Sequence, residues 1–126
     1  MTAAAALLTF VLDEDIPGTL WQAVHDHNAD SPYVIDVTQV GRRADLPKGT
    51  KDQLLLRWAE QERRLLVTCD LRTMPRHLAV HLSAGRHSPG VLIIRPCPVH
   101  DVIEHLAEMA HASQPEEWLD VLRIFP

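Results

Sequence analysis

The sequence predicts an α/β fold, a three-layer α/β/α domain around a mainly parallel central sheet of about five strands. Short apolar runs of strand length, such as residues 10–12 and 65–68, alternate along the chain with segments of helical periodicity. An aspartate closely follows each of these two runs, at Asp13 and at Asp70. Because the carboxyl ends of parallel strands share one edge of a sheet, we expect the two acids to face the same crevice.

The remaining elements follow the same alternation. Further strands are expected at residues 33–37, 91–94 and 119–125, the last of them at a sheet edge. Apolar residues at helical spacing predict helices over residues 16–28, 51–64, 71–82 and 99–111. Asp15 is expected as the N-cap of the first helix, and Thr50 with Gln53 as a capping box for the second.

Length and composition are those of one globular domain spanning residues 1–126. The chain is 46% hydrophobic and 23% charged, and no apolar run in it reaches membrane-spanning length. Residues 1–8 lack the basic residues that open a signal peptide, so we expect a cytoplasmic protein with no membrane partner. Cys69 and Cys97 are expected as reduced thiols, since a lone cysteine pair in such a chain seldom forms a bridge.

The chain is acidic overall but basic in one loop. Its formal net charge is −5, from 17 acidic and 12 basic residues, which argues against binding to nucleic acid by bulk charge alone. The loop at residues 41–51 nevertheless contains Arg42, Arg43, Lys48 and Lys51, and Arg95 follows the strand at residues 91–94. These five side chains are candidates for binding phosphate around the acids, with solvated charge an equally good interpretation for the loop residues.

Four carboxylates fall where this fold would bring side chains together. Asp13 and Glu14 follow the first strand, Asp70 follows the third, and Asp52 lies in the first turn of the second helix. Mg²⁺ needs only one or two protein carboxylates beside water and substrate phosphate, so dispersed acids at a sheet edge suffice for a site. Each acid taken alone also has a structural interpretation, because aspartate is favoured in turns and in first helical turns.

Several segments resemble one known family. Residues 12–17, Leu-Asp-Glu-Asp-Ile-Pro, resemble the Leu-Asp-Glu-Asn-hydrophobe-Pro opening of small bacterial PIN-like proteins, a branch of the PIN ribonuclease superfamily with many toxin–antitoxin members. Residues 50–59 are similar to that group's acid-led helix, and residues 64–70 to its Arg-hydrophobe-hydrophobe-Val-Thr-X-Asp strand. Residues 90–95 resemble its last core strand, so the likeness extends from residue 7 to about residue 110.

The resemblance implies a PIN-like fold and a metal-dependent endoribonuclease that hydrolyses RNA phosphodiesters. Asp13, Asp52 and Asp70 would then be the catalytic metal ligands for Mg²⁺ or Mn²⁺, with Glu14 as a fourth acid. A water would attack phosphorus without a nucleophilic side chain. A partner antitoxin protein and a homodimer are also implied by the family.

Two departures from the family pattern leave alternatives open. Thr73 stands where the family usually has a further acid, and Asp15 stands where it has asparagine. A PIN-like domain without activity, serving only to bind RNA or protein, is therefore one alternative. Another is a receiver-like signalling domain, in which Asp70 would be the phosphorylated aspartate and Arg95 would replace the usual lysine.

Histidine, threonine and cysteine offer further candidates. His77 and His81 lie four residues apart on one face of the third helix, but a zinc site would need two more ligands, so solvated surface histidines are the better interpretation. Thr68 is a candidate to orient a ligand or a water, with ordinary strand propensity as the alternative. Cys69 is disfavoured as a nucleophile, because a neighbouring carboxylate opposes formation of the thiolate.

Overall fold

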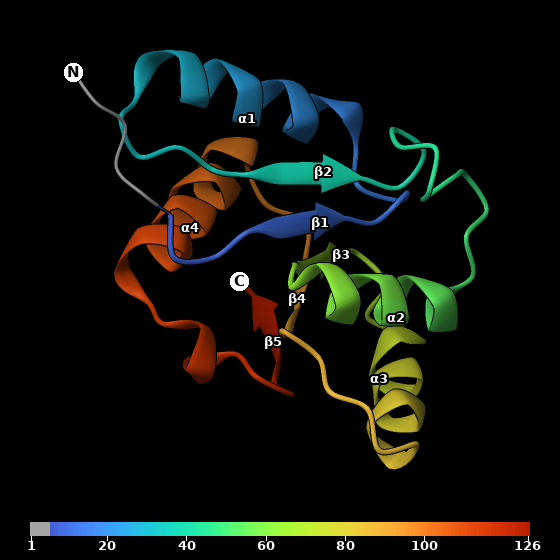
Figure 1. Cartoon of the computed structure of the whole chain (residues 1–126). Coiled ribbons are helices and arrows are strands. Elements are labelled where there is room, and N and C mark those ends of the chain that lie inside the picture. Colours follow the sequence, from blue (N-terminus) through green and yellow to red (C-terminus); the bar gives the residue numbers. More distant parts are fainter. Residues whose placement is uncertain (1–5) are drawn as a thin grey trace.

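The computed structural model describes residues 6–126 and confirms the α/β fold, with all five of its strands parallel (Figure 1). The α-helices expected from the sequence are all present within that range, four in number. The elements follow one another in the order β1 (Phe10–Leu12), α1 (Gly18–Asp30), β2 (Val37–Gln39), α2 (Asp52–Glu62), β3 (Leu65–Thr68), α3 (Met74–Ser83), β4 (Val91–Ile94), α4 (Val99–Ala112), a 3₁₀ turn η1 (Pro115–Glu117) and β5 (Leu122–Phe125).

The strand order fixes where a ligand site is expected. The strands lie in the order β2-β1-β3-β4-β5, with β1 between β2 and β3. The order reverses between β1 and β3, which is the topological switch point of a doubly wound sheet. Ligands of open parallel sheets bind beyond the carboxyl ends of the strands at such a point. The segments that follow β1 and β3 are therefore the place to look for a site.

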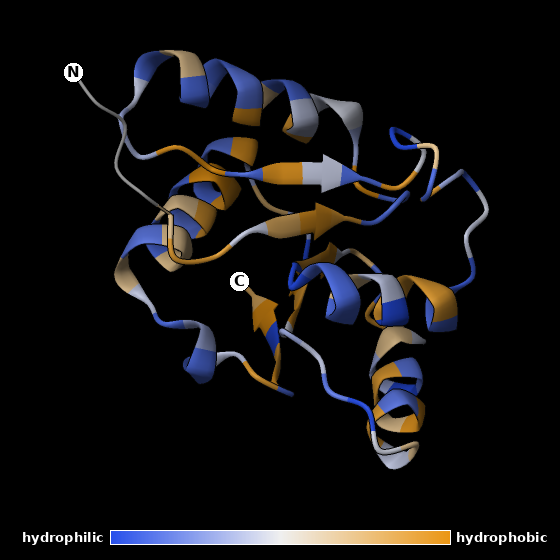
Figure 2. Ribbon diagram, viewed as in Figure 1, coloured by the Kyte–Doolittle hydropathy of each residue, from blue (hydrophilic) through white to orange (hydrophobic). Residues whose placement is uncertain are grey.

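Helices cover both faces of the sheet. In Figure 1, α1 and α4 pack together on one face, and α2 and α3 pack together on the other. Alternating strand residues serve the two faces: Leu12 and Val67 join the core beneath α1 and α4, whereas Val11 and Leu66 join the core beneath α2 and α3. The strands are accordingly apolar throughout in the centre of the sheet, as the orange colouring of Figure 2 shows.

The prediction of β2 over residues 33–37 is wrong, because the strand begins only at Val37. The side chain of Asn28 near the end of α1 binds both peptide groups of Ile35. Its Nδ2 donates to the carbonyl oxygen and its Oδ1 accepts from the N–H, each at 2.8 Å. These bonds satisfy Ile35 outside the sheet, so the β-branched and aromatic run before Val37 cannot join the ladder.

Both predicted helix caps are also wrong. The α1 helix begins at Gly18 behind Pro17, and neither α1 nor α2 has a side-chain N-cap bond. The Thr50 hydroxyl donates instead to a carbonyl oxygen of its own loop, and the Gln53 amide reaches His77 on α3 at 3.1 and 3.2 Å. A partner within the loop has taken the Thr50 hydroxyl, and a partner distant in sequence has taken the Gln53 amide, in place of the capping box that the spacing suggested.

Smaller shifts occur at two other element boundaries. The α3 helix begins at Met74 rather than at residue 71, and β5 begins at Leu122 rather than at residue 119. Asp120 precedes β5 with a φ of 61°, and its carboxylate accepts the Ser88 N–H at 2.7 Å, so the chain turns there before it becomes extended. Of the sequence expected to lead into β1, residues 1–5 lie outside the described range. None of the helices between residues 6 and 126 combines the length and apolar character needed to cross a bilayer.

Gly90, directly before β4, provides a test of this packing. Its φ is +124°, and a Cβ at this position would lie 2.8 Å from the Trp118 carbonyl oxygen. We expect Gly90→Ala to lower the free energy of unfolding by about 3 kcal/mol, from backbone strain and steric overlap together. Urea unfolding followed by circular dichroism measures this change.

The matched control for this substitution is Gly18→Ala. Gly18 opens α1, and no atom lies within 4 Å of the position of an added Cβ. We expect this variant to stay within about 1 kcal/mol of the unmodified chain, on the stabilising side. Equal loss of stability in both variants would show that the close approach to Trp118 does not exist.

Candidate active site at the carboxyl edge of the sheet

Asp13 lies one residue beyond β1, beside the end of β3. Its N–H donates to the Val67 carbonyl oxygen at 2.8 Å, which extends the β1–β3 ladder by one residue. Because Leu12 and Val67 are paired and face α1 and α4, the residues that follow them, Asp13 and Thr68, turn toward α2 and α3. The Thr68 hydroxyl donates to Asp13 Oδ2 at 2.8 Å.

Thr68 contacts three acidic residues through one hydroxyl group. Besides its bond to Asp13, its Oγ1 lies 3.4 Å from Asp15 Oδ2 and accepts the Asp70 N–H at 3.1 Å. The residue has no exposed surface. Thr68 therefore positions the acids from the interior of the protein. Its side chain is not available to contact a substrate or a water, contrary to the role considered from the sequence.

Asp15 is the site residue that sequence reasoning misplaced. Its Oδ1 accepts the Cys69 N–H at 3.2 Å, so its carboxylate lies over the end of β3 instead of capping α1. In the sequence, Asp15 stands out only as the last residue of the acidic run 13–15, at the position where PIN-like proteins have asparagine. A helix-cap interpretation needs only local sequence, whereas the contact with Cys69 depends on the pairing of β1 with β3.

Asp70 is held by Thr73. The Thr73 N–H donates to Asp70 Oδ1 at 2.8 Å, and the Thr73 hydroxyl donates to Oδ2. Burial opposes ionisation of Asp70, but these hydrogen bonds favour the charged form and lower its pKa below the ordinary value. Thr73 thus keeps the carboxylate of Asp70 ionised and fixed.

Asp52 approaches the site from α2. It is the first residue of that helix, and its Oδ2 lies 3.1 Å from Nε2 of His77 on α3. Its charge contributes to raised pKa values at both Asp13 and Asp15. The structure therefore brings the carboxylates of Asp13 and Asp15 and the backbone of Asp70 to the Thr68 hydroxyl, with Asp52 near enough for its charge to act on Asp13 and Asp15.

His77 and His81 do not share a metal site. The His81 ring is buried, and its Nε2 lies 3.2 Å from Glu60 Oε1 and 2.8 Å from the His87 carbonyl oxygen. His77 contacts Asp52 instead. The two histidines on one face of α3 thus serve separate contacts between α2 and α3, and the expectation that they are solvated does not hold for His81.

Glu14 points away from the other acids. Its Oε1 accepts the Gly49 N–H at 2.8 Å, which ties the loop at residues 41–51 to the end of β1. The structure thus places Glu14 as a loop anchor, apart from the group around Thr68. Glu14, Arg42 and Lys48 line a shallow hollow of about 320 Å³ next to the acids.

Gln39, at the end of β2, supports the turn that carries Asp13 and Asp15. The side chain is buried, and its Nε2 donates to the carbonyl oxygens of Asp13 at 3.1 Å and Ile16 at 3.0 Å. Its Oε1 accepts from Arg42 Nε at 3.0 Å, and the Arg42 guanidinium lies 4.0 Å from the centre of the Trp21 ring. Nothing in the sequence pattern pointed to Gln39, because a single polar residue at a strand end is ordinary.

The predicted basic rim is divided between two sides of the site. Arg42 and Lys48 lie at the hollow beside Glu14, whereas Arg43 forms an ion pair with Asp45 at 2.9 Å. Arg95 follows β4 and lines a different pocket. The remaining basic candidate, Lys51, is exposed at the start of α2.

The acids repel one another. Burial raises the pKa of Asp13 from 3.8 to about 6, and the charges of Asp15 and Asp52 add to this rise while the Thr68 hydroxyl opposes it. Burial also raises the pKa of Asp15, with a further contribution from the charge of Asp70. Carboxylates left with too few positive or donor partners are a setting in which a cation is stabilised.

The donor set fits Mg²⁺ or Mn²⁺. These ions prefer carboxylate oxygens and keep several waters, so they need direct contact with only one or two of the acids. Asp13, whose pKa is raised most among these acids, is the side chain best placed to hold such an ion. Among residues 6–126, the four acids do not form a closed cage, since no three of their ligand atoms all lie within 4.8 Å of one another.

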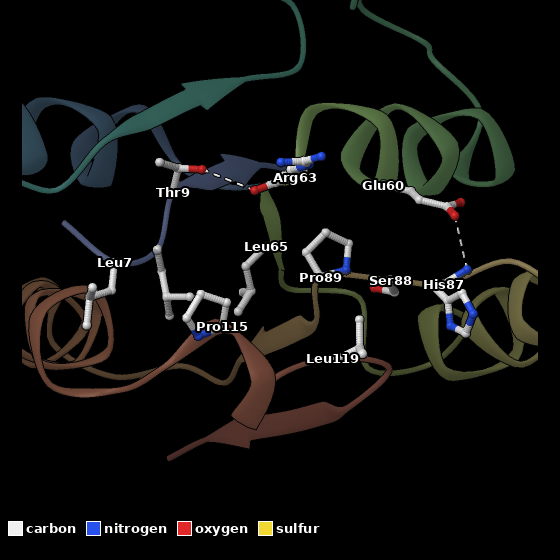
Figure 3. Close-up of a pocket in the computed structure, with 11 residues that line it drawn as sticks. Leu7, Thr9, Glu60, Arg63, Leu65, His87, Ser88, Pro89, Pro115 and Leu119 are labelled. Atoms are coloured by element: carbon white, nitrogen blue, oxygen red, sulfur yellow. Dashed lines mark hydrogen bonds between the residues drawn. The ribbon is translucent and has the colours of Figure 1, made fainter.

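Other hollows and clusters lie apart from these acids. His100, Asp101 and Glu104 bring ligand atoms within 4.8 Å on the surface of α4, where His100 and Glu104 form an ion pair one helical turn apart. Figure 3 shows a pocket of about 440 Å³ at the opposite edge of the sheet, where Leu65 begins β3 and Pro89 precedes β4. Its wall is largely apolar, and none of the four acids reaches it.

Comparison of the chain with protein-family models, with curated proteins and with solved structures gives no significant match. The resemblance to PIN-like proteins therefore remains a prediction from motifs.

The raised pKa of Asp13 can be measured by NMR titration of its carboxyl carbon. We expect a midpoint near the value of about 6, lowered in Asp15→Asn and raised further in Thr68→Val. The folded chain binds this proton more tightly than the unfolded chain, so protonation of Asp13 stabilises the fold. This stabilisation is fully present below pH 3.8 and is lost as the pH rises through about 6. A midpoint near 4 that neither Asp15→Asn nor Thr68→Val shifts would contradict this arrangement of the acids. Asp101→Asn on α4 serves as the control.

Proposed function

We propose that the chain is a metal-dependent endoribonuclease that hydrolyses RNA phosphodiesters with Mg²⁺ or Mn²⁺. The observation that carries the proposal is the group Asp13, Asp15 and Asp70 around the Thr68 hydroxyl, at the switch point of the sheet, with the pKa of Asp13 raised to about 6. The motif resemblance to PIN-like ribonucleases supports the reaction class. An antitoxin partner, a homodimer and a cytoplasmic location remain predictions of that resemblance and of the sequence.

The chain's own residues would divide the work as follows. Asp13, with Asp52 and Asp70 nearby, would hold the ion, and Thr68 with Gln39 would keep the acids in place. When bound, the ion would neutralise charge on the phosphate and make water a better nucleophile. Asp15, whose pKa is also raised, would accept a proton from that water. Arg42 and Lys48 on one side, and Arg95 on the other, would bind the flanking phosphates.

The test is cleavage of a labelled single-stranded RNA by the purified chain in Mg²⁺ or Mn²⁺. We expect cleavage that EDTA abolishes and that Asp13→Asn lowers by about 10²-fold or more, since a displaced ligand removes charge stabilisation in the transition state. Asp30→Asn, at the far end of α1, should leave the rate unchanged. Activity should fall as the pH drops through about 6, because protonated Asp13 binds a cation poorly.

Two results would contradict the ribonuclease. Cleavage that survives both EDTA and Asp13→Asn would come from a contaminant or from other residues. Binding of RNA without cleavage in either ion would instead favour the inactive PIN-like binding module.

The strand order favours a second candidate, a receiver-like signalling domain. The order 2-1-3-4-5 is that of response-regulator receivers, which carry acids after the first strand and a phosphorylated aspartate after the third. Asp13 and Asp70 occupy those places. Against this candidate, both oxygens of Asp70 are already bonded by Thr73, and Arg95 follows β4 where a lysine was expected.

Incubation with acetyl phosphate and Mg²⁺, followed by intact-mass measurement, separates the two candidates. A ribonuclease should gain no phosphoryl group under these conditions. Addition of one phosphoryl group in the unmodified chain, absent from Asp70→Asn and retained in Asp45→Asn, would establish the receiver and overturn the ribonuclease.

A further inference from the structure

A pocket of about 370 Å³ opens at the same carboxyl edge as the acids, on the opposite face of the sheet. Cys69 follows Thr68, so strand alternation turns it toward α1 and α4, where it forms part of the pocket wall. Ile16, directly after Asp15, forms another part. Because Asp15 also accepts the Cys69 N–H, the pocket and the acidic group share one wall.

The pocket combines an apolar floor with one cation. Leu20, Ile94 and Val102, all buried in the core beneath α1 and α4, form the floor. Arg95, directly after β4, is exposed and lines the pocket, and the half-buried Cys97 also lines it. A volume of about 370 Å³ lies in the range of small-molecule sites, roughly 300–1,000 Å³. An occupant should therefore have a flat or compact apolar body and an anionic group.

We propose that this pocket receives the base of an unpaired nucleotide whose neighbouring phosphate would lie at the cation held by the acids, with Arg95 on an adjoining phosphate. The inference rests on the proposed ribonuclease and names its substrate class. A base in a duplex is paired and stacked, so it cannot enter a pocket without leaving the helix. The substrate is then single-stranded RNA or an RNA loop.

The lining also determines how strongly the four bases are distinguished. Recognition of a base edge needs fixed donors and acceptors, and among the lining residues only Thr19, Arg95 and the two thiols carry polar side-chain groups. Binding is then driven by burial of the base, and all four nucleoside monophosphates should bind with similar affinity.

Calorimetric titration in Mg²⁺ with AMP and with ribose 5-phosphate tests the proposal without any cleavage. The two probes share a phosphate and a sugar and differ in the base. We expect AMP to bind about tenfold more tightly or better, which corresponds to about 1.4 kcal/mol from the base. Arg95→Ala should leave the ratio of the two affinities unchanged, because the probes differ only in the base.

Substitution of Cys97 locates the base. Cys97→Phe should fill the pocket and reduce AMP to the affinity of ribose 5-phosphate, while Cys97→Ser keeps the volume and the preference. The proposal is overturned if the unmodified chain binds the two probes equally or binds neither. It is also overturned if folded Cys97→Phe still prefers AMP to ribose 5-phosphate. If the chain prefers AMP but cleaves no RNA, the base pocket is supported and only the proposed ribonuclease activity is contradicted.

Discussion

The parallel pairing of β1 with β3 sets the position of the acids described above. In its register Leu12 lies opposite Val67, and the next bond of the ladder, from Asp13 to the Val67 carbonyl oxygen, brings Asp13 beside Thr68. A slip of one residue would turn Thr68 to the other face of the sheet and leave Asp13 without its hydrogen bond. The apolar side chains of both strands oppose such a slip, because each residue is committed to one of two separate cores.

The same pairing concentrates charge where the fold would be more stable without it. The single Thr68 hydroxyl hydrogen faces the carboxylates of both Asp13 and Asp15, and one donor cannot compensate for both charges. Burial, with the charges of Asp15 and Asp52 adding to it, raises the pKa of Asp13 to about 6 despite the Thr68 bond. Local arrangements that cost stability are common at functional sites, which is why the acidic edge supports a function better than its motifs alone do.

The buried strands were the most predictable part of the fold. The apolar runs that became β1, β3 and β4 lie between helices on both faces, so they are continuous in sequence and end at the residues expected. The edges were harder to predict. The run before Val37 has strand propensity, yet Asn28 binds Ile35 and removes it from the ladder.

The site could be predicted only as a set of acids, not as a geometry. Asp13 and Asp70 were found from their places after strands, and both lie in the acidic group. Asp15 and Gln39 were missed because their decisive contacts are with residues far along the chain: Cys69 lies 54 residues from Asp15, and Ile16 lies 23 residues from Gln39. Local spacing carries no information about such contacts, so it favoured a helix cap for Asp15 and assigned no role to Gln39.

The separation of the paired strands in sequence has a consequence for folding. The hydroxyl of Thr68 and the carboxylate of Asp13 are 55 residues apart, and a helix, a strand, a long loop and a second helix must be placed before they meet. Contacts of such long range form late and slow the search for the native state. A nascent or partly folded chain therefore carries the acids but not their arrangement, and any activity of this edge would appear only once the centre of the sheet has closed.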